Sequence, residues 1–509
     1  MKKNKTNGLF SSSLAVTLLA LPASGADHFW NVAGPADWHT PSNWDNGLIP
    51  DGGGGAHARI NNGGTAVLNA DIANIQDIFV GSGAGTSGTL NHTGGTTQLG
   101  GTTNGWMFVG NAGGTGTVNQ SGGVQTKERL FYGRADGGTD STGFFNLSGD
   151  GLVNNGEVHF GVDGSGAIGT GTLADNGRIQ TGLFQIANGS VSVTDTASID
   201  AAGEFWVGNG VGNTGSLSMD SGTAESDSWI AIGRDGSDGT LTLSGTATLN
   251  KVGNAEHFIS LGGVGAGGGG TLNIQDNATL NSVSNIVIAE NAGRFGVVNQ
   301  SGGTVNVLDN ILHTTFTASV EVDGSGSGLG EYNLSGGTLN AQTIDVSAGA
   351  FNMTGGILSA TVFNGNLDQA GGTLSPGASP GNTLINGDWL QQAAGDFLVE
   401  LNGLIAATEH DQVDVTGTID LAGGLQISLG FNPEIGDTFT IVDNQGAGAI
   451  TGTFSQGSTV SANGRDFAID YLGGDGNDIV LTVVGIPEPS TSLLSLGALL
   501  ALVGRRRRA

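Results

Sequence analysis

Short apolar runs separated by glycine-rich turns recur through the middle of the chain. Each run ends in an apolar residue followed by a small one, and nine such pairs occur: Val80-Gly81, Val109-Gly110, Tyr132-Gly133, Phe160-Gly161, Ile186-Ala187, Val207-Gly208, Ile232-Gly233, Leu261-Gly262 and Ile288-Ala289. Their eight intervals cover 208 residues, so the mean period is 26 residues. A polar turn usually follows, then a strand such as Gly116-Thr117-Val118 and a corner such as Ser121-Gly122-Gly123. This pattern predicts three short strands and three turns in each repeat.

Three short strands are too few to close a hydrophobic core, so each repeat must bury its apolar side against the next. We therefore expect an all-β fold, a right-handed parallel β-helix of some ten to thirteen coils, about 50 to 60 Å long. Glycine would occupy corners where the backbone turns left-handed or passes close to a neighbouring coil. Asparagines at turns would form a stacked amide ladder: Asn91, Asn119, Asn273 and Asn299. An antiparallel sandwich or a propeller is the alternative, because both also contain many short strands.

The ends of a stack of repeats should differ from its middle, because open strand edges aggregate. Residues 27–70 hold Trp30, Trp38 and Trp44, and we expect them to form an N-terminal cap. A carbohydrate-stacking platform is the alternative use of these tryptophans. Repeats would fill residues 71–373. From Leu374 two prolines interrupt the pattern and more regular alternation follows, which predicts a C-terminal β domain over residues 374–484.

The tryptophan-rich start resembles the start of passenger-like β-strand-repeat proteins of environmental bacteria. Two stretches of the C-terminal segment, residues 411–424 and 436–441, resemble the terminal segment of autotransporter-like passengers. No translocating barrel follows these stretches, which departs from a true autotransporter. The resemblance therefore implies a fold and not a route of secretion.

The first 26 residues have the layout of a secretory signal peptide. Lys2, Lys3 and Lys5 precede the apolar run from Leu14 to Leu21, and the small residues that follow it offer a cleavage site before Asp27. A buried N-terminal helix is the alternative. With a signal peptide, the chain would be exported from a bacterial cytoplasm.

Residues 485–509 combine three features in a fixed order. Pro487, Glu488 and Pro489 come first, a short apolar stretch from Ser490 to Gly504 follows, and four arginines close the segment: Arg505, Arg506, Arg507 and Arg508. Fifteen helical residues reach only about 22 Å, less than the ~30 Å hydrocarbon core, so the segment is a marginal transmembrane helix. The arginines should stay on the cytoplasmic side and hold the body outside.

This order closely resembles the bacterial PEP-CTERM sorting signal. The resemblance implies recognition by an exosortase, a membrane-embedded cysteine transpeptidase, with cleavage near Pro487 to Pro489. Inner-membrane anchoring would then be transient, and release or transfer to the surface of a Gram-negative-type cell would follow. An ordinary anchor that is never cut is the alternative.

Composition narrows the class of exported protein. The chain has 95 glycines but only nine prolines, which excludes collagen, and 37% hydrophobic residues argue against a disordered chain. It has no cysteine, so disulfides, thiolate metal sites and a cysteine nucleophile are excluded. Outside the two end segments, nine basic residues stand against forty-four acidic ones, a net charge of about −35. Such a field repels nucleic acid and anionic membranes and suits a hydrated, cation-rich matrix.

One turn matches a calcium-binding nonapeptide. Gly473-Gly474-Asp475-Gly476-Asn477-Asp478 precedes the strand-like Ile479-Val480-Leu481, and Asp475 and Asp478 are the candidate ligands. Calcium in such repeats is shared between adjacent copies, and no second copy flanks this one. A tight hairpin turn is therefore the preferred interpretation, and we expect no cofactor.

Catalytic patterns are weak. The eight histidines show no metal-ligand spacing: His28, His39, His57, His92, His159, His257, His313 and His410. Arg134 and Arg234 occupy equivalent positions after a strand-end pair, but about 20 Å should separate them, and a solvated turn explains each. We expect no enzyme but a structural or adhesive β-solenoid in extracellular polysaccharide or biofilm. A polysaccharide-binding or polysaccharide-degrading β-helix is the alternative function.

Overall fold

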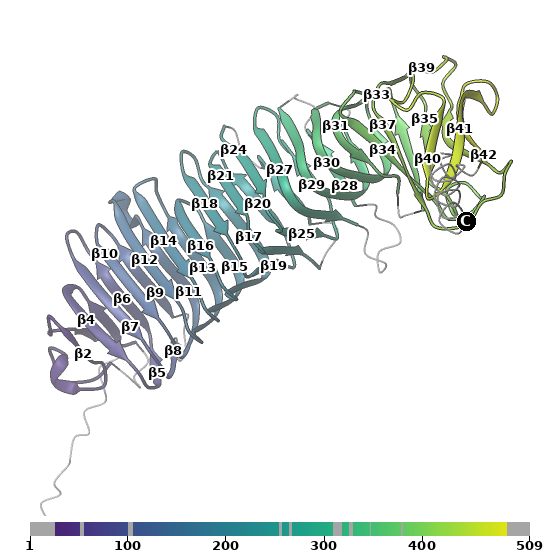
Figure 1. Ribbon diagram of the computed structural model, residues 1–509. Helices are drawn as coiled ribbons and strands as arrows, with labels where there is room; N and C mark the ends of the chain where they lie inside the picture. The colour runs from purple at the N-terminus through teal and green to yellow at the C-terminus, as the bar shows by residue number, and fades with distance from the viewer. Residues whose placement is uncertain are drawn as a thin grey trace, which may run out of the picture.

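The computed structural model describes residues 26–50, 55–99, 105–253, 257–263, 267–308, 318–324, 329–346, 348–377 and 380–485. Within them the chain forms 42 strands, no α-helix and two short 3-10 turns, η1 (Pro41–Asn43) and η2 (Asp136–Gly138). The expected all-β fold is confirmed. The molecule is elongated, with its N-terminal strands at one end and its C-terminal strands at the other (Figure 1). All but the last residue of the predicted signal peptide, and residues 486–509 with the predicted helix, lie outside the described residues.

Apart from β40, β41 and β42 at the C-terminal end, the strands form three columns, in which neighbouring strands pair in parallel from one repeat to the next. Column A contains the strand-end pairs that define the repeat. Its members are β1 (Asp27–Phe29), β3 (His57–Ile60), β6 (Asp77–Ser82), β9 (Trp106–Asn111), β11 (Val124–Arg134), β13 (Leu152–Val162), β15 (Arg178–Ile186), β17 (Ser198–Asn209), β20 (Ile230–Arg234), β23 (Ile259–Leu261), β26 (Ile286–Ile288), β28 (Ser319–Val322), β29 (Gly330–Asp345), β30 (Ala350–Asn364), β32 (Asn382–Asn386), β35 (Gln412–Val415) and β38 (Thr438–Asn444).

Column B holds the Gly-Thr-Leu-like strands. They are β2 (Pro35–Asp37), β4 (Asn62–Leu68), β7 (Ser87–His92), β10 (Thr115–Gln120), β12 (Ser141–Leu147), β14 (Ala167–Leu173), β16 (Gly189–Val193), β18 (Thr214–Met219), β21 (Asp238–Leu243), β24 (Gly269–Ile274), β27 (Phe295–Val307), then parts of β29 and β30, and β31 (Leu367–Leu374), β33 (Trp389–Gln391), β36 (Ile419–Leu421) and β39 (Thr451–Gly452).

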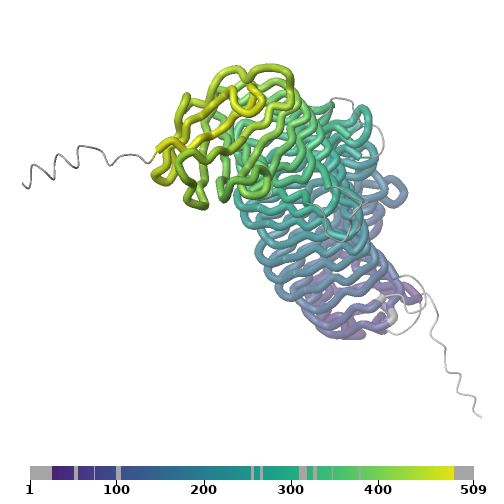
Figure 2. The backbone as a smooth tube through the Cα atoms, turned by 90° about the vertical axis from the view of Figure 1, so that its right-hand side faces the viewer, coloured from purple at the N-terminus to yellow at the C-terminus, as the bar shows by residue number. Residues whose placement is uncertain are grey.

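Column C completes each repeat. It contains β5 (Ile72–Ile75), β8 (Thr96–Leu99), β19 (Thr223–Ser226), β22 (Thr248–Lys251), β25 (Thr279–Ser282), β34 (Gly395–Leu401) and β37 (Gly424–Leu429), and the long strands β11, β13, β15, β17, β27, β29, β30 and β31 supply its other members. Successive turns of the chain lie one above another along the molecule (Figure 2).

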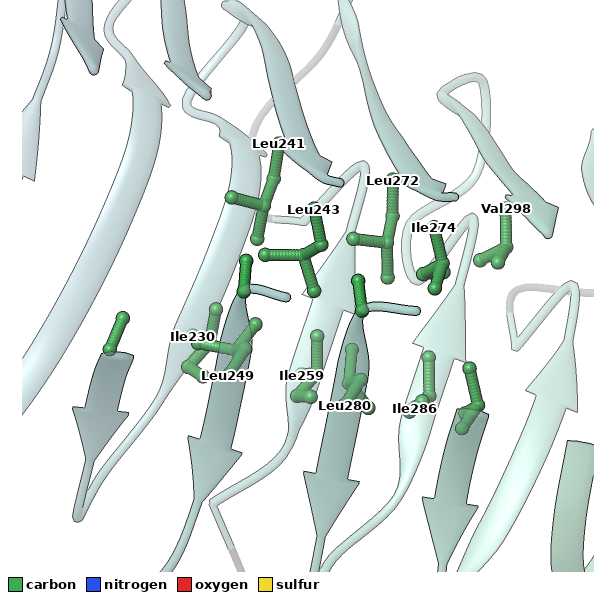
Figure 3. Packing of buried hydrophobic residues seen from close by; sticks show 14 of the residues in the cluster. Ile230, Leu241, Leu243, Leu249, Ile259, Leu272, Ile274, Leu280, Ile286 and Val298 are labelled. Atoms are coloured by element: carbon green, nitrogen blue, oxygen red, sulfur yellow. The ribbon is translucent and has the colours of Figure 1, made fainter. Parts of the chain in front are cut away.

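Like residues stack in register and form the core. All nine predicted strand-end apolar residues pair directly, from Val80↔Val109 to Leu261↔Ile288, and all are buried. In the middle of the rod, Leu241, Leu272 and Val298 of column B face Ile230, Ile259 and Ile286 of column A across the interior (Figure 3). The apolar stripe of one repeat is therefore covered by its neighbours, as the period required.

The small residue after each strand end turns the corner. Gly110 has φ +64°, and a Cβ there would overlap the carbonyl oxygen of Thr142 in the next repeat. Only glycine meets both conditions without strain. Seven of the nine small residues are glycines with positive φ, and Ala289 takes the same conformation at +51°.

The expected amide ladder is present, although its members lie in strands and not in turns. Asn119 donates to Asn91 at 2.9 Å, and Asn146 donates to Asn119 at 2.7 Å. A second run joins Asn273, Asn299, Asn333 and Asn352 through bonds of 2.8–3.0 Å. A strand position suits the ladder because the register of the strands recurs in every repeat, whereas turn lengths vary.

Both ends differ from the middle. Trp30, Trp38 and Trp44 are buried and pack edge to face, with ring centroids 4.8–5.1 Å apart. This burial supports the cap interpretation and contradicts a carbohydrate platform. At the other end, parallel pairing continues past the prolines after Leu374, so they do not interrupt the stack. Antiparallel pairing joins β38, β42 (Asp478–Gly485), β41 (Arg465–Gly473) and β40 (Thr459–Ala462). No helix in this described part of the chain is long and apolar enough to cross a membrane.

Candidate functional site

The residue just before each strand-end pair faces away from the core. These residues, together with Arg59 one repeat before the first pair, stack in register along column A and form what we call the outward column: Arg59, Phe79, Phe108, Phe131, His159, Gln185, Trp206, Ala231, Ser260 and Val287. The strands that carry them lie side by side (Figure 1). Five of these ten side chains are aromatic rings, counting His159, so one face of the molecule carries an aromatic stripe.

The first rings of the outward column stack on one another. Phe79 and Phe108 have centroids 5.0 Å apart, Phe108 and Phe131 5.4 Å, and Phe131 and His159 4.9 Å, with interplanar angles of 8–13°. Phe108 and Phe131 are buried in a small hydrophobic cluster outside the main core. Their ring faces contact neighbouring rings, so these residues bind the repeats together.

Arginines cover this aromatic stripe. The guanidinium carbon of Arg59 lies 4.1 Å from the ring centroid of Phe79. The guanidinium carbon of Arg234 lies at the same distance, 4.1 Å, from the ring centroid of Trp206. Arg134 lies over Phe131 at 5.2 Å, and Arg129 over Trp106 at 5.6 Å. Four of the nine basic residues of the strongly acidic body thus gather on one face.

Each of these arginines also contacts a carboxylate. Arg59 lies 2.9 Å from Asp27, Arg129 2.9 Å from Glu157 and Arg234 4.0 Å from Asp235, while Arg134 pairs with Asp163. The face therefore combines aromatic rings with charge pairs and has no excess of positive charge.

Two hollows open on this face. The long hollow has a volume of about 530 Å³ and is lined by Trp106, Arg129, Phe131, Arg134, Glu157, His159, Val162, Asp163, Gly164, Ser165, Gln185, Ala187, Asn209, Gly210, Val211 and Asn213. Within it, the Glu157 carboxylate accepts hydrogen bonds from His159 at 2.8 Å and from Arg129 at 3.1 Å. The bond from His159 leads the interactions that lower the pKa of Glu157, so this group is a fixed carboxylate at neutral pH and not a general acid.

The second hollow, which we call the tryptophan hollow, measures about 220 Å³. It is lined by Glu204, Trp206, Trp229, Ala231, Arg234, Ser260, Gly263 and Glu290. The small side chains of Ala231 and Ser260 follow Trp206 in the outward column, and this change in size leaves the space open. Trp229 is held edge to face on Phe258, with centroids 4.2 Å apart. Ser260 donates its hydroxyl hydrogen to Glu290.

The sequence interpretation of two arginines is corrected by this geometry. Arg134 and Arg234 are not isolated on solvated turns, because each packs over an aromatic ring and lines one of the hollows. Sequence reasoning missed Trp106, Trp206 and Trp229 altogether. The signal was present: an aromatic residue directly precedes the strand-end pair in four of the nine repeats, at Phe79, Phe108, Phe131 and Trp206.

The calcium candidate is a hairpin turn between β41 and β42. Gly473 pairs with Asp478, and Gly476 donates its N–H to the Gly473 carbonyl at 2.8 Å. The Asp478 carboxylate accepts N–H bonds from Asn444 at 3.0 Å and from Asp475 at 3.4 Å. Asp475 itself is exposed. Across the described ranges, no group of three or more His, Cys, Asp or Glu side chains is placed to hold a metal ion.

The predicted sorting residues, Pro487 to Pro489 and Arg505 to Arg508, lie outside the described residues, as does His313. A comparison of the chain with curated proteins finds no match. A comparison with protein families finds one at residues 485–508, the PEP-CTERM protein-sorting motif. Such motifs imply in general an exported, membrane-anchored protein that an exosortase recognises. The chain therefore carries a PEP-CTERM protein-sorting motif over residues 485–508.

Proposed function

We propose that the protein is a right-handed parallel β-helix, exported and sorted by an exosortase, that serves as a structural or adhesive component of the extracellular matrix. The sorting motif at residues 485–508 carries the proposal. Three columns of in-register parallel strands support a solenoid, because a column of this kind arises when one strand of every coil stacks on the last.

A matrix role fits the physical properties of the body. Stacked strands make an extended, stiff rod, and a net charge of about −35 keeps it hydrated and soluble among polymers. In this proposal the rod is held at the membrane through residues 490–508, cut near Pro487 to Pro489 and then embedded in polysaccharide. Hydroxyl, amide and cation-bridged contacts would attach it there.

A polysaccharide-degrading β-helix is the second candidate, favoured by the two hollows on one face. The pairing of Glu157 with Arg129 and His159 opposes a role for this group as the acid of hydrolysis, because that acid must still hold its proton. We therefore propose binding without turnover.

Intact-mass measurement of the protein recovered separately from membranes and from matrix tests the sorting step. We expect a matrix form that ends near Pro487 and a full-length membrane form. Glu488→Ala should leave the full-length form in the membrane and deplete the matrix form, whereas Glu434→Ala, on an exposed turn of the body, should not. A matrix form of full length, or equal processing of both variants, would show that this tail does not direct cleavage.

A further inference from the structure

We propose that the tryptophan hollow and the long hollow bind a neutral polysaccharide that lies along the rod. This assignment goes beyond sorting and the matrix role, because it names a site and a chemical class of ligand. It starts from the indole rings of Trp206 and Trp229, which line a hollow that the small side chains of Ala231 and Ser260 keep open.

Aromatic rings next to polar groups suit a sugar ring. The C–H face of a pyranose is apolar and packs on an indole, while its hydroxyl groups both donate and accept hydrogen bonds. The tryptophan hollow offers acceptors on Glu204 and Glu290 and a donor on Arg234. The Arg234 guanidinium covers one face of the Trp206 ring, so a sugar would pack on the remaining surface of that ring and on Trp229. The long hollow adds amides, Gln185, Asn209 and Asn213, that can do both. This mixture fits a polyol better than a purely apolar ligand.

Charge selects a neutral polymer. Arg129, Arg134 and Arg234 each lie within 4.0 Å of a carboxylate, so none of them is an unopposed cation for a uronate or sulfate group. The surrounding body carries about −35 and repels a polyanion over a Debye length. A neutral polysaccharide needs no unopposed cation and is not repelled by the acidic body.

The placement of the two hollows indicates that the ligand is a polysaccharide chain and not a single sugar. Strand β17 contributes Trp206 to one hollow and Asn209 to the other, so the hollows meet at this strand. From there the long hollow runs back to β9 and the tryptophan hollow runs forward past β23. A ligand that fills both must extend across successive repeats, parallel to the rod axis.

Affinity electrophoresis of the purified full-length chain through gels that contain one polysaccharide at a time tests the proposal. The neutral probes are mixed-linkage β-glucan, galactomannan and arabinoxylan, and the acidic probes are polygalacturonate and alginate. We expect retardation by at least one neutral polymer and by neither acidic one. Trp206→Ala and Trp229→Ala should each weaken binding about tenfold or more, the range of a buried aromatic contact.

Two further variants separate binding from folding. Ala231→Trp fills the hollow and removes no ligand-binding group, and the neighbouring position of the outward column already carries tryptophan, so the fold should persist while binding is lost. Phe144→Ala removes an exposed ring from β12, outside both hollows, and should bind like the parent chain. Retention of neutral-polymer binding in Ala231→Trp, preference for an acidic polymer, or no binding to any neutral polymer would overturn the proposal. None of these outcomes bears on cleavage of the sorting tail.

Discussion

At the scale of single residues, the corners between strands decide which side chains are tolerated. Gly110 and Gly137 both have positive φ, +64° and +72°. A Cβ at Gly110 would overlap the Thr142 backbone, whereas a Cβ at Gly137 would meet nothing within 4 Å. Comparing alanine substitutions at these two positions therefore distinguishes the cost of backbone strain from the cost of a clash with the next repeat.

We expect Gly137→Ala to cost about 1 to 2 kcal/mol, the strain of the left-handed conformation alone. Gly110→Ala should cost about 3 to 5 kcal/mol, because overpacking against the next repeat adds to that strain. Denaturant unfolding of both variants measures the difference. Equal costs would mean that the Thr142 backbone of the next repeat moves aside freely.

A second corner uses a buried amide. Gln120, Gln300 and Gln369 each donate Nε2–H to the carbonyl of a glycine three residues later, at 3.0–3.5 Å. His92 takes the same place in an earlier repeat and reaches the Gly95 carbonyl at 3.2 Å. Burial lowers the pKa of His92 to about 4.

Because the folded pKa of His92 lies below its ordinary value of 6.5, the unfolded chain binds the proton more tightly. The stability from neutral His92 is therefore complete above about pH 6.5 and is lost as the pH falls toward 4, by about 3 kcal/mol in all. His92→Gln should keep the bond to Gly95 and remove this loss. Amide hydrogen exchange of β7 and β8 between pH 7 and 4.5 is the measurement, with His257→Gln, on a half-exposed histidine, as control.

At the scale of elements, the amide ladder ties strands of column B together. Asn119 both donates to Asn91 and accepts from Asn146, whereas Asn91 takes part as an acceptor. A carboxylate can accept but not donate. Asn91→Asp therefore keeps the bond from Asn119, while Asn119→Asp places two acceptor oxygens together.

We expect Asn119→Asp to destabilise the protein by about 1 to 3 kcal/mol and Asn91→Asp by less than about 1 kcal/mol. Thermal unfolding of both variants at pH 7 provides the comparison, since each adds the same charge at the same register position. The reverse order would contradict the donor and acceptor roles described for the ladder.

The strands were largely predictable from the sequence, but the face that carries the outward column and its two hollows was not. The strand-end pairs predicted column A in correct register, because core packing requires an apolar residue and a tight corner in every repeat. The outward column carries phenylalanine, histidine, glutamine, tryptophan and alanine in turn, so no repeated letter marks it. The sequence gives no sign of the shared role of Arg134 and Arg234 for the same reason, because only stacking brings the rings of neighbouring repeats beneath them.

At the scale of the whole molecule, stability should vary along the rod, because each repeat contacts only its neighbours. In the C-terminal part, the buried Asp411 carboxylate accepts 2.8 Å bonds from the N–H groups of Gly381 and Glu400. Burial outweighs these bonds and raises the pKa of Asp411 to about 6. The pKa shift of Asp411 is therefore opposite in direction to that of His92. The contribution of Asp411 to stability is complete below about pH 4 and is lost as the pH rises through 6.

The two ends should thus respond oppositely to acid. Between pH 7 and 4.5, exchange protection corrected for intrinsic rates should fall around His92 and rise in β32, β34 and β35. Burial also raises the pKa of Asp414 and of Asp443, and it lowers the pKa of His410. Asp411→Asn should therefore reduce the C-terminal response without abolishing it and leave the N-terminal one unchanged. A shift of both regions in the same direction would show that general charge effects of the acidic body dominate.

The antiparallel pairing at the C-terminal end has a mechanical consequence. The sorting tail continues from Gly485 at the end of β42, a strand that is hydrogen-bonded to β38 on one side and to β41 on the other. Tension along β42 loads the bonds of both edges together in shear and cannot open them one after another. In the anchored state proposed above, this group of three antiparallel strands would bear the drag on the body, and the parallel strands behind it would keep their register.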